Sequence, residues 1–420
     1  MLSRLFKKLI FTVVLQPILL FGLFYSSGFS ADAISWGRFL LSPQIAVEEQ
    51  YSDNIFQEHK NTKKDNIVTV SPGLSSYLAT TDNSRLGLHY KGDFSFYAKY
   101  DDLDGRDNEG KVDWSLTTPS DSTFEIGTKI LDTAIQSDDK ILNKAIQSDD
   151  KMLGKAIQPD DEDDTDQPYL LKTAYADTNL KPGEFTEIGF RYEYISREFD
   201  DRSGLAYDSD QDDYDRNLFR LDYVNKYFPR FPLLLDYRHT INNRNDLEGS
   251  AGDSRSNAIY VGARWTPETR LSGNLRIGYQ KTEYEGEEDV NKLVTDTALT
   301  YRLTDVTNLQ LKVNRSLEDS TRAENESGHN YTFTTWQGTI QYNYSEPLKL
   351  SFRLRYQNKK FDKTANREED DIYKTRIGLE YALNQWVDLS LSYQYKQTVS
   401  DDETEEYKEN SGFFGVRLSL

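Results

Sequence analysis

The polar positions in the last part of the chain carry a concentration of positive charge. Between residues 348 and 398, polar side chains alternate with apolar ones, and the polar face holds six bases and two acids. The bases are Lys349, Arg353, Arg355, Lys374, Arg376 and Lys396, and the acids are Glu380 and Asp388. Guanidinium and ammonium groups that line a water-filled passage lower the electrostatic barrier for an anionic solute. These residues therefore predict an anion pathway.

The same bases could instead be neutralised by carboxylates from elsewhere in the chain. Glu187, Glu193 and Asp236 occupy polar positions of earlier segments, and an acidic loop could fold inward. Charges taken out of water are stabilised only when they are paired. The sequence leaves open both a charge-lined pathway and a wall whose charges cancel.

The sequence lacks the linear motifs of the common catalytic and cofactor sites. The four histidines, His59, His89, His239 and His329, have no metal-ligand spacing such as HExxH. There is no GxSxG nucleophile turn, no glycine-rich nucleotide motif, and no cysteine for thiol catalysis or disulfides. We therefore expect neither an enzyme nor a cofactor. An enzyme whose site is assembled from distant strands stays a third alternative.

The acidic run at 208–213 is a weak candidate for a calcium site. Asp208, Asp210 and Asp212 place carboxylates at alternate positions, as at the start of a calcium-binding loop. An EF-hand requires glycine at loop position six and glutamate at position twelve, where this chain has Asp213 and Phe219. A solvated acidic loop is the alternative. Such loops could also bridge to lipopolysaccharide through divalent ions.

A period of two governs the elements that must position these side chains. In residues 85–100, apolar residues such as Leu86 and Leu88 alternate with polar ones, as in a β-strand with one apolar and one polar face. Clear copies of the pattern lie at 348–357 and 387–396. We count about eighteen such segments, with sixteen as the alternative. The pattern predicts an all-β protein.

The connections between these segments alternate in length. Short ones with turn residues lie at 80–84, 119–122, 267–270, 304–307 and 345–347. Long acidic ones lie at 101–108, 199–215, 318–330 and 400–410. This alternation is typical of a single antiparallel up-and-down transmembrane β-barrel, with short periplasmic turns and long external loops.

Composition separates a membrane barrel from a soluble β-sandwich. The chain has 28 tyrosines and five tryptophans, and many of them end apolar rows, where amphipathic rings suit the membrane interfaces. A mean hydropathy of −0.74 fits a barrel that turns its apolar face to lipid and keeps a polar lumen. A closed barrel leaves no unpaired backbone edge in lipid. The net charge of −20 disfavours binding to nucleic acid.

The start of the chain has the pattern of a secretory signal peptide. Residues 1–8 are basic, an apolar run follows, and small residues appear near residue 30. An uncleaved inner-membrane anchor is the alternative. We predict a signal peptide at 1–30, a periplasmic segment at 31–40 and a barrel at 41–420. The mature protein would then lie in the outer membrane of a Gram-negative bacterium, among lipid and lipopolysaccharide. Its C-terminal strand would engage the barrel-assembly machinery.

One insertion interrupts the strand pattern. An eleven-residue unit at 134–144 repeats at 145–155 and begins again at 156–161, within an expected external loop at 132–168. Apolar pairs spaced seven and four apart fit a short helix that would cap one barrel mouth. A neutral duplication in a tolerant loop is the alternative.

The barrel prediction assigns a set of charged residues to the lumen wall. The pore-lining candidates are Arg85, His89, Lys91, Asp93, Glu187, Arg191, Glu193, Asp236, Arg238, Arg276, Lys349, Arg353, Arg355, Lys374, Arg376, Glu380, Lys396 and Arg417. They would contact a polar solute during its passage through the barrel.

A short motif near the N-terminus gives a family resemblance. Residues 45–78 combine YSDNIF with a downstream D-x-I-x-x-x-x-PGL; the motif positions are Tyr51, Asp53, Asn54, Pro72 and Gly73. This stretch resembles the start of the putative beta-barrel porin 2-like families, outer-membrane barrels found beside exopolysaccharide and capsule loci. Tyr51 suits the membrane interface at the end of the first strand, and the Asp-Asn pair suits a turn. The proline lacks a hydrogen-bond donor for the ladder, so a bulge or an irregular edge is expected there.

The resemblance implies a porin-like barrel whose solutes are polar. Together with the basic residues it suggests a channel for anionic solutes, with an acidic polysaccharide or its fragments as cargo. The rival hypothesis is a barrel that conducts nothing and acts through its loops or surface. A barrel of this width normally encloses water, which favours passage.

Overall fold

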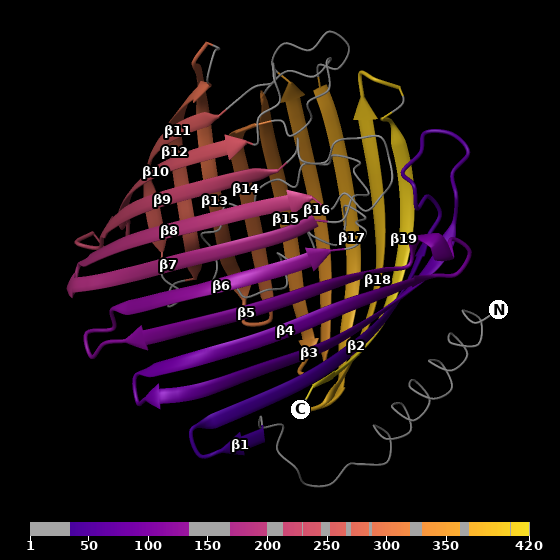
Figure 1. Cartoon of the computed structure of the whole chain (residues 1–420), viewed down its shortest axis with the longest axis horizontal. Coiled ribbons are helices and arrows are strands. Elements are labelled where there is room, and N and C mark those ends of the chain that lie inside the picture. Colours follow the sequence, from indigo (N-terminus) through magenta and orange to yellow (C-terminus); the bar gives the residue numbers. More distant parts are fainter. Residues whose placement is uncertain are drawn as a thin grey trace.

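The computed structural model describes most of the chain as one antiparallel β-sheet that closes on itself (Figure 1). The described residues are 34–133, 169–199, 213–228, 230–244, 253–265, 270–284, 288–319, 330–361, 369–403 and 405–419. The predicted leader at 1–30, the repeat at 134–161 and the candidate calcium ligands Asp208, Asp210 and Asp212 lie outside these residues. Those three hypotheses stay predictions.

Nineteen strands make up the sheet. In chain order they are β1 (Ile34–Trp36), β2 (Phe39–Ser52), β3 (Asp65–Thr81), β4 (Ser84–Tyr97), β5 (Gly105–Thr117), β6 (Thr123–Thr133), β7 (Tyr169–Gly183), β8 (Thr186–Phe199), β9 (Tyr214–Asn225), β10 (Leu233–Arg244), β11 (Ser254–Trp265), β12 (Leu271–Tyr284), β13 (Val290–Thr304), β14 (Thr307–Asp319), β15 (Asn330–Ser345), β16 (Leu348–Phe361), β17 (Glu369–Asn384), β18 (Val387–Ser400) and β19 (Tyr407–Ser419). One short 3-10 helix, Asp101–Leu103, follows β4.

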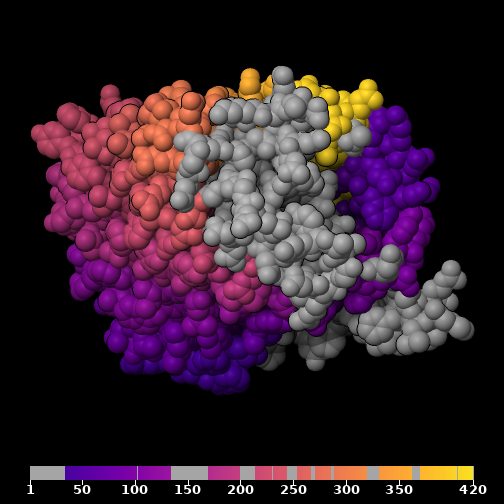
Figure 2. Space-filling view, turned by 45° about the horizontal axis from the view of Figure 1, so that its top comes forward, coloured from indigo at the N-terminus to yellow at the C-terminus, as the bar shows by residue number. Residues whose placement is uncertain are grey.

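The barrel consists of β2 to β19, each strand paired with its neighbours in sequence. The last strand pairs with the first, from Ser411 beside Ser52 to Ser419 beside Gln44. Figure 2 shows this closure, because the yellow C-terminal strands lie beside the indigo N-terminal ones. The short strand β1 pairs with β2 as a small hairpin. The prediction of about eighteen strands in one up-and-down barrel is confirmed.

The alternation of the sequence separates an apolar outer face from a polar lumen. In β12, Ile277 and Tyr279 point outward and are half exposed, while Arg276 and Gln280, on either side of them in the sequence, are buried. Among the described residues the buried apolar cluster is small and holds Ala258, Tyr260 and Val294. The interior is therefore polar, as a lumen requires.

Short and long connections alternate along the barrel. Two-residue turns join β3 to β4, β13 to β14 and β15 to β16, whereas the connections at the other end are longer. Barrel strand β2 begins and β19 ends at the short-turn end (Figure 1). The predicted loop at 101–108 is shorter than expected, because β5 already begins at Gly105. No helix in the described part of the chain is long and apolar enough to span a membrane.

The proline in β3 interrupts a ladder without changing its register. The pairs Val70–Phe94 and Gly73–Lys91 flank two unpaired positions that include Pro72, and the register is the same on both sides. Proline lacks an N–H group for the ladder, so the interruption has a direct cause. The expected irregularity is present there, but it is not a bulge.

Candidate functional site

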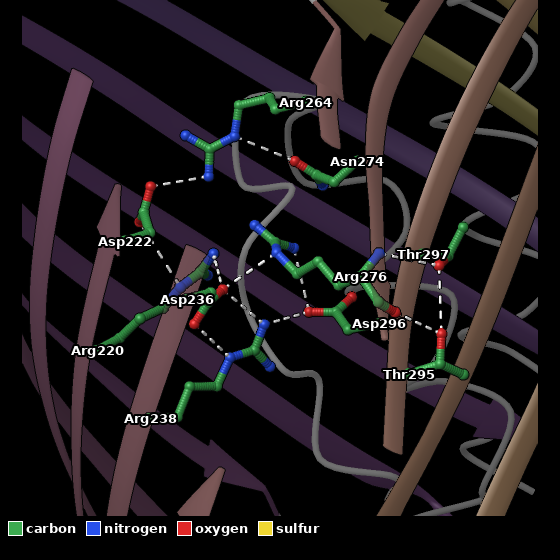
Figure 3. Close-up of polar contacts among 10 residues, drawn as sticks. All are labelled: Arg220, Asp222, Asp236, Arg238, Arg264, Asn274, Arg276, Thr295, Asp296 and Thr297. Carbon is green, nitrogen blue, oxygen red and sulfur yellow. Dashed lines mark hydrogen bonds and ion pairs between the residues drawn. The ribbon is translucent and has the colours of Figure 1, made fainter. Parts of the chain in front are cut away.

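The centre of the charged lumen wall is Asp236 on β10, which three arginines share (Figure 3). Its carboxylate lies 2.8 Å from Nη2 of Arg220 on β9 and 3.1 Å from Nε of Arg276 on β12. Nε of Arg238, on the same strand, donates to it at 3.2 Å. Because the barrel wall curves, residues two strands apart meet over the lumen face.

Two further aspartates extend this cluster. Asp296 on β13 accepts hydrogen bonds from Arg238 and, at 3.2 Å, from Arg276. Asp222 on β9 lies 2.9 Å from the guanidinium of Arg264 on β11. Its members are four arginines and three aspartates: Arg220, Arg238, Arg264, Arg276, Asp222, Asp236 and Asp296.

These charges are withdrawn from water. The side chain of Asp236 is 0% exposed, that of Arg276 is 1% and that of Arg220 is 6%. The guanidinium of Arg238 lies 4.5 Å from the ring centre of Tyr260, a cation–π contact. Ion pairs this deeply buried hold one another in a fixed geometry, and removal of one partner leaves an uncompensated charge.

The pairing continues across the earlier strands of the barrel. On β8, Arg191 lies 2.9 Å from Glu193 and 3.7 Å from Asp177 of β7. On β5, Lys111 lies 3.3 Å from Asp113, which is also 3.2 Å from His89 of β4. We call the lumen face of β4 to β13 the paired wall, because bases and acids contact each other throughout it.

The later strands carry a different arrangement, which we call the basic wall. It consists of Arg353, Arg355, Lys374, Arg376 and Lys396 on the lumen face of β16, β17 and β18. Arg353 lies directly opposite Arg376, and Lys374 lies between Arg355 and Lys396. Like charges directly opposite each other across strands are destabilising.

The basic wall makes hydrogen bonds with neutral side chains. Nε of Arg355 donates to Gln337 at 2.9 Å, and Nη2 of Arg376 donates to Oγ of Ser392 at 2.8 Å. Nζ of Lys396 donates to the side-chain oxygen of Gln57 at 2.9 Å. These contacts orient the side chains of the three cations.

Two further acids lie at the loop end of these strands: Asp370, which the sequence count over 348–398 missed, and Glu409, which lies beyond that stretch. Glu409 on β19 lies opposite Lys396, and Asp370 on β17 lies opposite Lys359. Glu409 accepts a hydrogen bond from Ser52 at 2.7 Å, and Asp370 accepts one from Ser400 at 2.6 Å. The inward acids of these strands are therefore not limited to Glu380 and Asp388.

The structure brings several of the predicted pore-lining residues together. Those in the paired wall are His89, Arg191, Glu193, Asp236, Arg238 and Arg276, and those in the basic wall are Arg353, Arg355, Lys374, Arg376 and Lys396. Lys91 forms a separate ion pair with Asp93 at 3.5 Å.

The remaining candidates lie toward the short-turn end. Glu187 accepts a hydrogen bond from Lys226 at 2.5 Å, and Arg85 lies over the ring of Tyr77. The pairs Lys349–Glu380 and Asp388–Arg417 face each other across strands.

These contacts bear on the hypothesis that early acids neutralise the late bases. Glu187, Glu193 and Asp236 contact bases on their own side of the barrel instead. Each of these acids pairs with a base on its own strand or on a nearby segment.

The sequence search missed four members of the cluster: Arg220, Asp222, Arg264 and Asp296. Arg220 and Asp222 sit two residues apart in β9, so the period of two places them on one face. Their signal was weak because their segment, NLFRLDYVN, has only two charged residues among its polar positions. The spacing R-x-D was nevertheless visible in the sequence.

The family motif builds the seam of the barrel rather than its lumen. The carboxylate of Asp53 accepts hydrogen bonds at 2.8 Å from the backbone and side-chain amides of Asn410 on β19. Asn54 is buried, and its Nδ2 donates to the backbone oxygens of Glu58 and Lys408, both at 3.0 Å. Tyr51 is exposed on the outer face.

Gly73 completes the motif, because it packs against Gln44 on β2. A Cβ atom at this position would lie 2.6 Å from the Gln44 side-chain nitrogen. Within the described part of the chain, no group of three or more His, Asp or Glu side chains is placed to hold a metal ion.

Comparison with known proteins identifies the family. The model of the family described as Putative beta-barrel porin 2 matches residues 185–420, which is more than half of the chain. The chain belongs to this family. The match spans β8 to β19, and therefore the whole arginine–aspartate cluster and the whole basic wall. The resemblance inferred from the N-terminal motif is confirmed by an independent part of the sequence.

Solved structures of outer-membrane barrels are similar to this chain over most of its length. The outer membrane protein opdK from Pseudomonas aeruginosa is 12% identical, with a TM-score of 0.47 over 90% of this chain and 99% of that one. A BenF-like porin from Pseudomonas fluorescens is 13% identical, with a TM-score of 0.48 over the same shares. A search of curated proteins finds no match.

The family and the barrel together define the class of this protein. A closed barrel with an apolar outer face and a polar lumen is the architecture of an outer-membrane porin. Membership in a porin family points to a channel rather than an enzyme. The arrangement of its lumen charges sets what such a channel would admit.

Proposed function

We propose that this protein is an outer-membrane channel that passes polar, anionic solutes. The observation that supports this most directly is the contrast between the two lumen walls. In the paired wall, carboxylates lie within ion-pair distance of arginines, as around Asp236. In the basic wall, cations face cations across β16, β17 and β18.

A one-sided distribution of charge favours anions over cations. The field of paired charges falls off quickly, because opposite charges cancel at a distance. Cations that face each other instead reinforce one another and attract a mobile anion. A solute that enters the lumen would therefore meet its strongest attraction along the basic wall.

The proposal extends to acidic saccharides as the solute class. Members of this class combine carboxylates, which suit arginine, with hydroxyl groups, which suit a polar lumen. The resemblance of the N-terminal motif to barrels beside exopolysaccharide and capsule loci supports a role in exopolysaccharide export or in handling surface polysaccharide.

Export and assembly complete the proposal. The leader at 1–30 would direct secretion and would be removed. The strand β19 would present its alternating pattern to the barrel-assembly machinery, and the outer loops would contact lipopolysaccharide. The half-exposed Phe414 on its outer face fits a strand that is inserted into lipid.

A barrel that conducts nothing is the second candidate, and one observation favours it. Arg276, Asp236 and Lys396 are almost completely buried, so side chains fill part of the interior. A lumen filled in this way throughout would support loops and surface contacts but would not pass solutes.

Planar-bilayer recordings separate the two candidates. The purified full chain is inserted between chambers that hold different KCl concentrations, and the reversal potential is measured. We expect discrete conductance steps with a reversal potential that favours chloride. The absence of conductance, or a preference for potassium, would contradict the proposed function. Liposome swelling with glucose and with glucuronate then tests whether the preference extends to sugars.

A further inference from the structure

A hydroxyl, an imidazole and a carboxylate contact one another across the neighbouring strands β3, β4 and β5. Oγ of Ser75 on β3 lies 3.1 Å from Nδ1 of His89 on β4. The other ring nitrogen of His89, Nε2, lies 3.2 Å from Oδ1 of Asp113 on β5. A serine beside a base, with the base beside an acid that orients it, is the arrangement that activates a serine nucleophile.

The three side chains face the lumen, and their exposure decreases from the serine to the acid. Leu74 and Leu88, the preceding residues of Ser75 and His89, are exposed on the outer face, so Ser75 and His89 point inward. Both are half buried, whereas the side chain of Asp113 is only 7% exposed. Oδ1 of Asp113 has no hydrogen-bond partner among the described residues and is available to accept one from the ring N–H. A solute can therefore reach the hydroxyl and the ring while the carboxylate is shielded from water.

A glycine makes room for the contact between the ring and the carboxylate. Gly87 on β4 lies directly opposite Asp113 and two residues before His89. A Cβ atom at Gly87 would lie 2.9 Å from Oδ2 of Asp113 and 2.9 Å from Nε2 of His89. Tyr77 on β3 packs edge-on against the imidazole, with 5.1 Å between the ring centres. The ring of His89 is therefore held on three sides.

Two further side chains place hydrogen-bond donors near the serine and the ring. Lys111 on β5 lies directly opposite His89, and its Nζ is 3.3 Å from Asp113. Gln44 on β2 carries its amide nitrogen over Gly73, 2.6 Å from where a Cβ atom would lie, and Gly73 is two residues before the serine on the same face. Lysine and glutamine side chains can both stabilise an oxygen on which negative charge develops.

A second serine on β3 shows what the arrangement looks like without the imidazole. Ser71 lies on the same face, and its hydroxyl donates directly to the carboxylate of Asp93. Lys91 lies 3.5 Å from that carboxylate. A carboxylate is a much weaker base than an imidazole at neutral pH, so this contact holds the hydroxyl without activating it. Ser71 therefore provides a matched control for Ser75.

We propose that Ser75, His89 and Asp113 hydrolyse carboxylic esters of polar alcohols, such as O-acylated sugars, in the lumen of the barrel. Ser75 is the nucleophile, His89 is the general base, and Asp113 is a positioning residue that orients the ring. When the ring proton is on Nε2, facing Asp113, Nδ1 accepts the proton of the Ser75 hydroxyl. A polar lumen admits esters whose alcohol part is hydrophilic. The inference goes beyond the proposed function, because it requires access to the lumen but not conductance.

The reaction requires only the ester and water. Oγ of Ser75 bonds to the carbonyl carbon of the ester while its proton moves to Nδ1 of His89. The bond between the carbonyl carbon and the alcohol oxygen then breaks, and the alcohol leaves with the proton from His89. A water molecule next attacks the acyl group on Ser75 and gives one proton to His89. The bond to Oγ breaks, the carboxylic acid leaves, and His89 returns the proton to Oγ.

Hydrolysis and covalent labelling of the purified full chain in detergent test the site. The probes are p-nitrophenyl acetate, whose hydrolysis releases a coloured phenolate, and an alkyl fluorophosphonate, which modifies activated serines. We expect phenolate release above the rate in detergent alone, and peptide mass spectrometry should locate the fluorophosphonate on Ser75. Hydrolysis no faster than in detergent alone would overturn the proposal. Labelling that spares Ser75 would overturn it as well.

Substitutions of the nucleophile and the base assign the reaction to these residues. Ser75→Ala should abolish both hydrolysis above background and labelling, because it removes the attacking oxygen. His89→Gln should lower kcat about a hundredfold or more, as expected when a general base is lost. Ser71→Ala should leave both readouts unchanged. The heat-dependent shift in gel mobility confirms that each variant is a folded barrel. A loss in Ser71→Ala as large as that in Ser75→Ala would contradict the assignment.

The positioning role of Asp113 has a separate kinetic signature. Asp113→Asn should lower kcat about tenfold or more and leave KM nearly unchanged, because the carboxylate acts through His89 and not on the ester. Asp113→Glu should recover part of the lost kcat. Gly87→Val places a side chain between the ring and the carboxylate and should lower kcat in the same way. An unchanged kcat in Asp113→Asn, or no recovery in Asp113→Glu, would overturn the positioning role.

Discussion

The paired wall and the basic wall differ in the charge of their adjacent rows, where a row is the set of residues that lie directly opposite one another on neighbouring strands. In the paired wall, Arg220 lies opposite Arg238, and the next row places Asp222 opposite Asp236. A row of arginines therefore lies beside a row of aspartates. In the basic wall, the row of Arg353 and Arg376 lies beside the row of Arg355, Lys374 and Lys396. The spacing of charges along a single strand creates this difference.

Residues two apart on a strand share a face, so they decide the charge of adjacent rows. The paired wall contains R-x-D on β9 and D-x-R on β10, and each strand neutralises itself. The basic wall contains R-x-R on β16 and K-x-R on β17, and charge accumulates. The first pattern produces the network of ion pairs around Asp236, and the second is the basis of the anion preference that we propose.

The largest effect should come from removal of the shared carboxylate in the paired wall. Asp236→Asn leaves Arg220, Arg238 and Arg276 without their common partner and should destabilise the barrel by about 3–5 kcal/mol. Urea unfolding in lipid vesicles measures this change. Arg353→Gln is the matched comparison, and it should cost little because it removes a repulsion. Equal destabilisation by the two variants would contradict the distinction between the walls.

A smaller effect concerns ion selectivity. The double variant Arg353→Glu with Arg376→Glu reverses one row of the basic wall and should reduce the chloride preference at least about threefold. Reversal potentials in planar bilayers measure it. The charge-balanced double variant Asp222→Asn with Arg264→Gln, in the paired wall, should leave the preference nearly unchanged. A comparable shift in both double variants would show that the walls act alike.

The smallest effect concerns the aromatic rings under the arginines. Tyr260 lies beneath Arg238 in the paired wall, and Phe413 lies beneath Arg376 in the basic wall. Replacement of either ring by leucine should cost about 0.5–2 kcal/mol, and the two costs should be similar. Urea unfolding midpoints provide the comparison. A large cost in one wall alone would mean that ring packing, rather than charge, distinguishes them.

The sequence predicted the fold more completely than the site. The period of two in segments such as 85–100 reports directly which face meets lipid, so strand number and barrel class followed from it. The period of two assigned the wrong face to some apolar residues that point into the lumen. Examples are Val224, Leu234 and Ile372, which are buried among polar neighbours. Packing near the strand ends places these residues.

Side-chain contacts between strands could not be predicted from the sequence. Asp296 contacts Arg238 three strands away, and this depends on barrel curvature and register rather than on local spacing. Tyrosines were expected at the outer interfaces, yet Tyr169, Tyr214 and Tyr331 are buried at the loop ends of their strands. A ring at a strand end has the same sequence signal whichever face it occupies.

The pairing of β19 with β2 makes closure of the barrel depend on the presence of the last strand. Asp53 and Asn410 hydrogen-bond across a separation of 357 residues, so the first loop finds its partner only in the last strand. A chain that ends early, or that loses a hairpin, exposes the open edge of β2 and leaves the Asp53 carboxylate without these amide donors. Open edges invite aggregation and have no stable place in lipid. Pairing of the two terminal strands therefore satisfies the last open edge of the sheet, and a chain without β19 cannot reach that state.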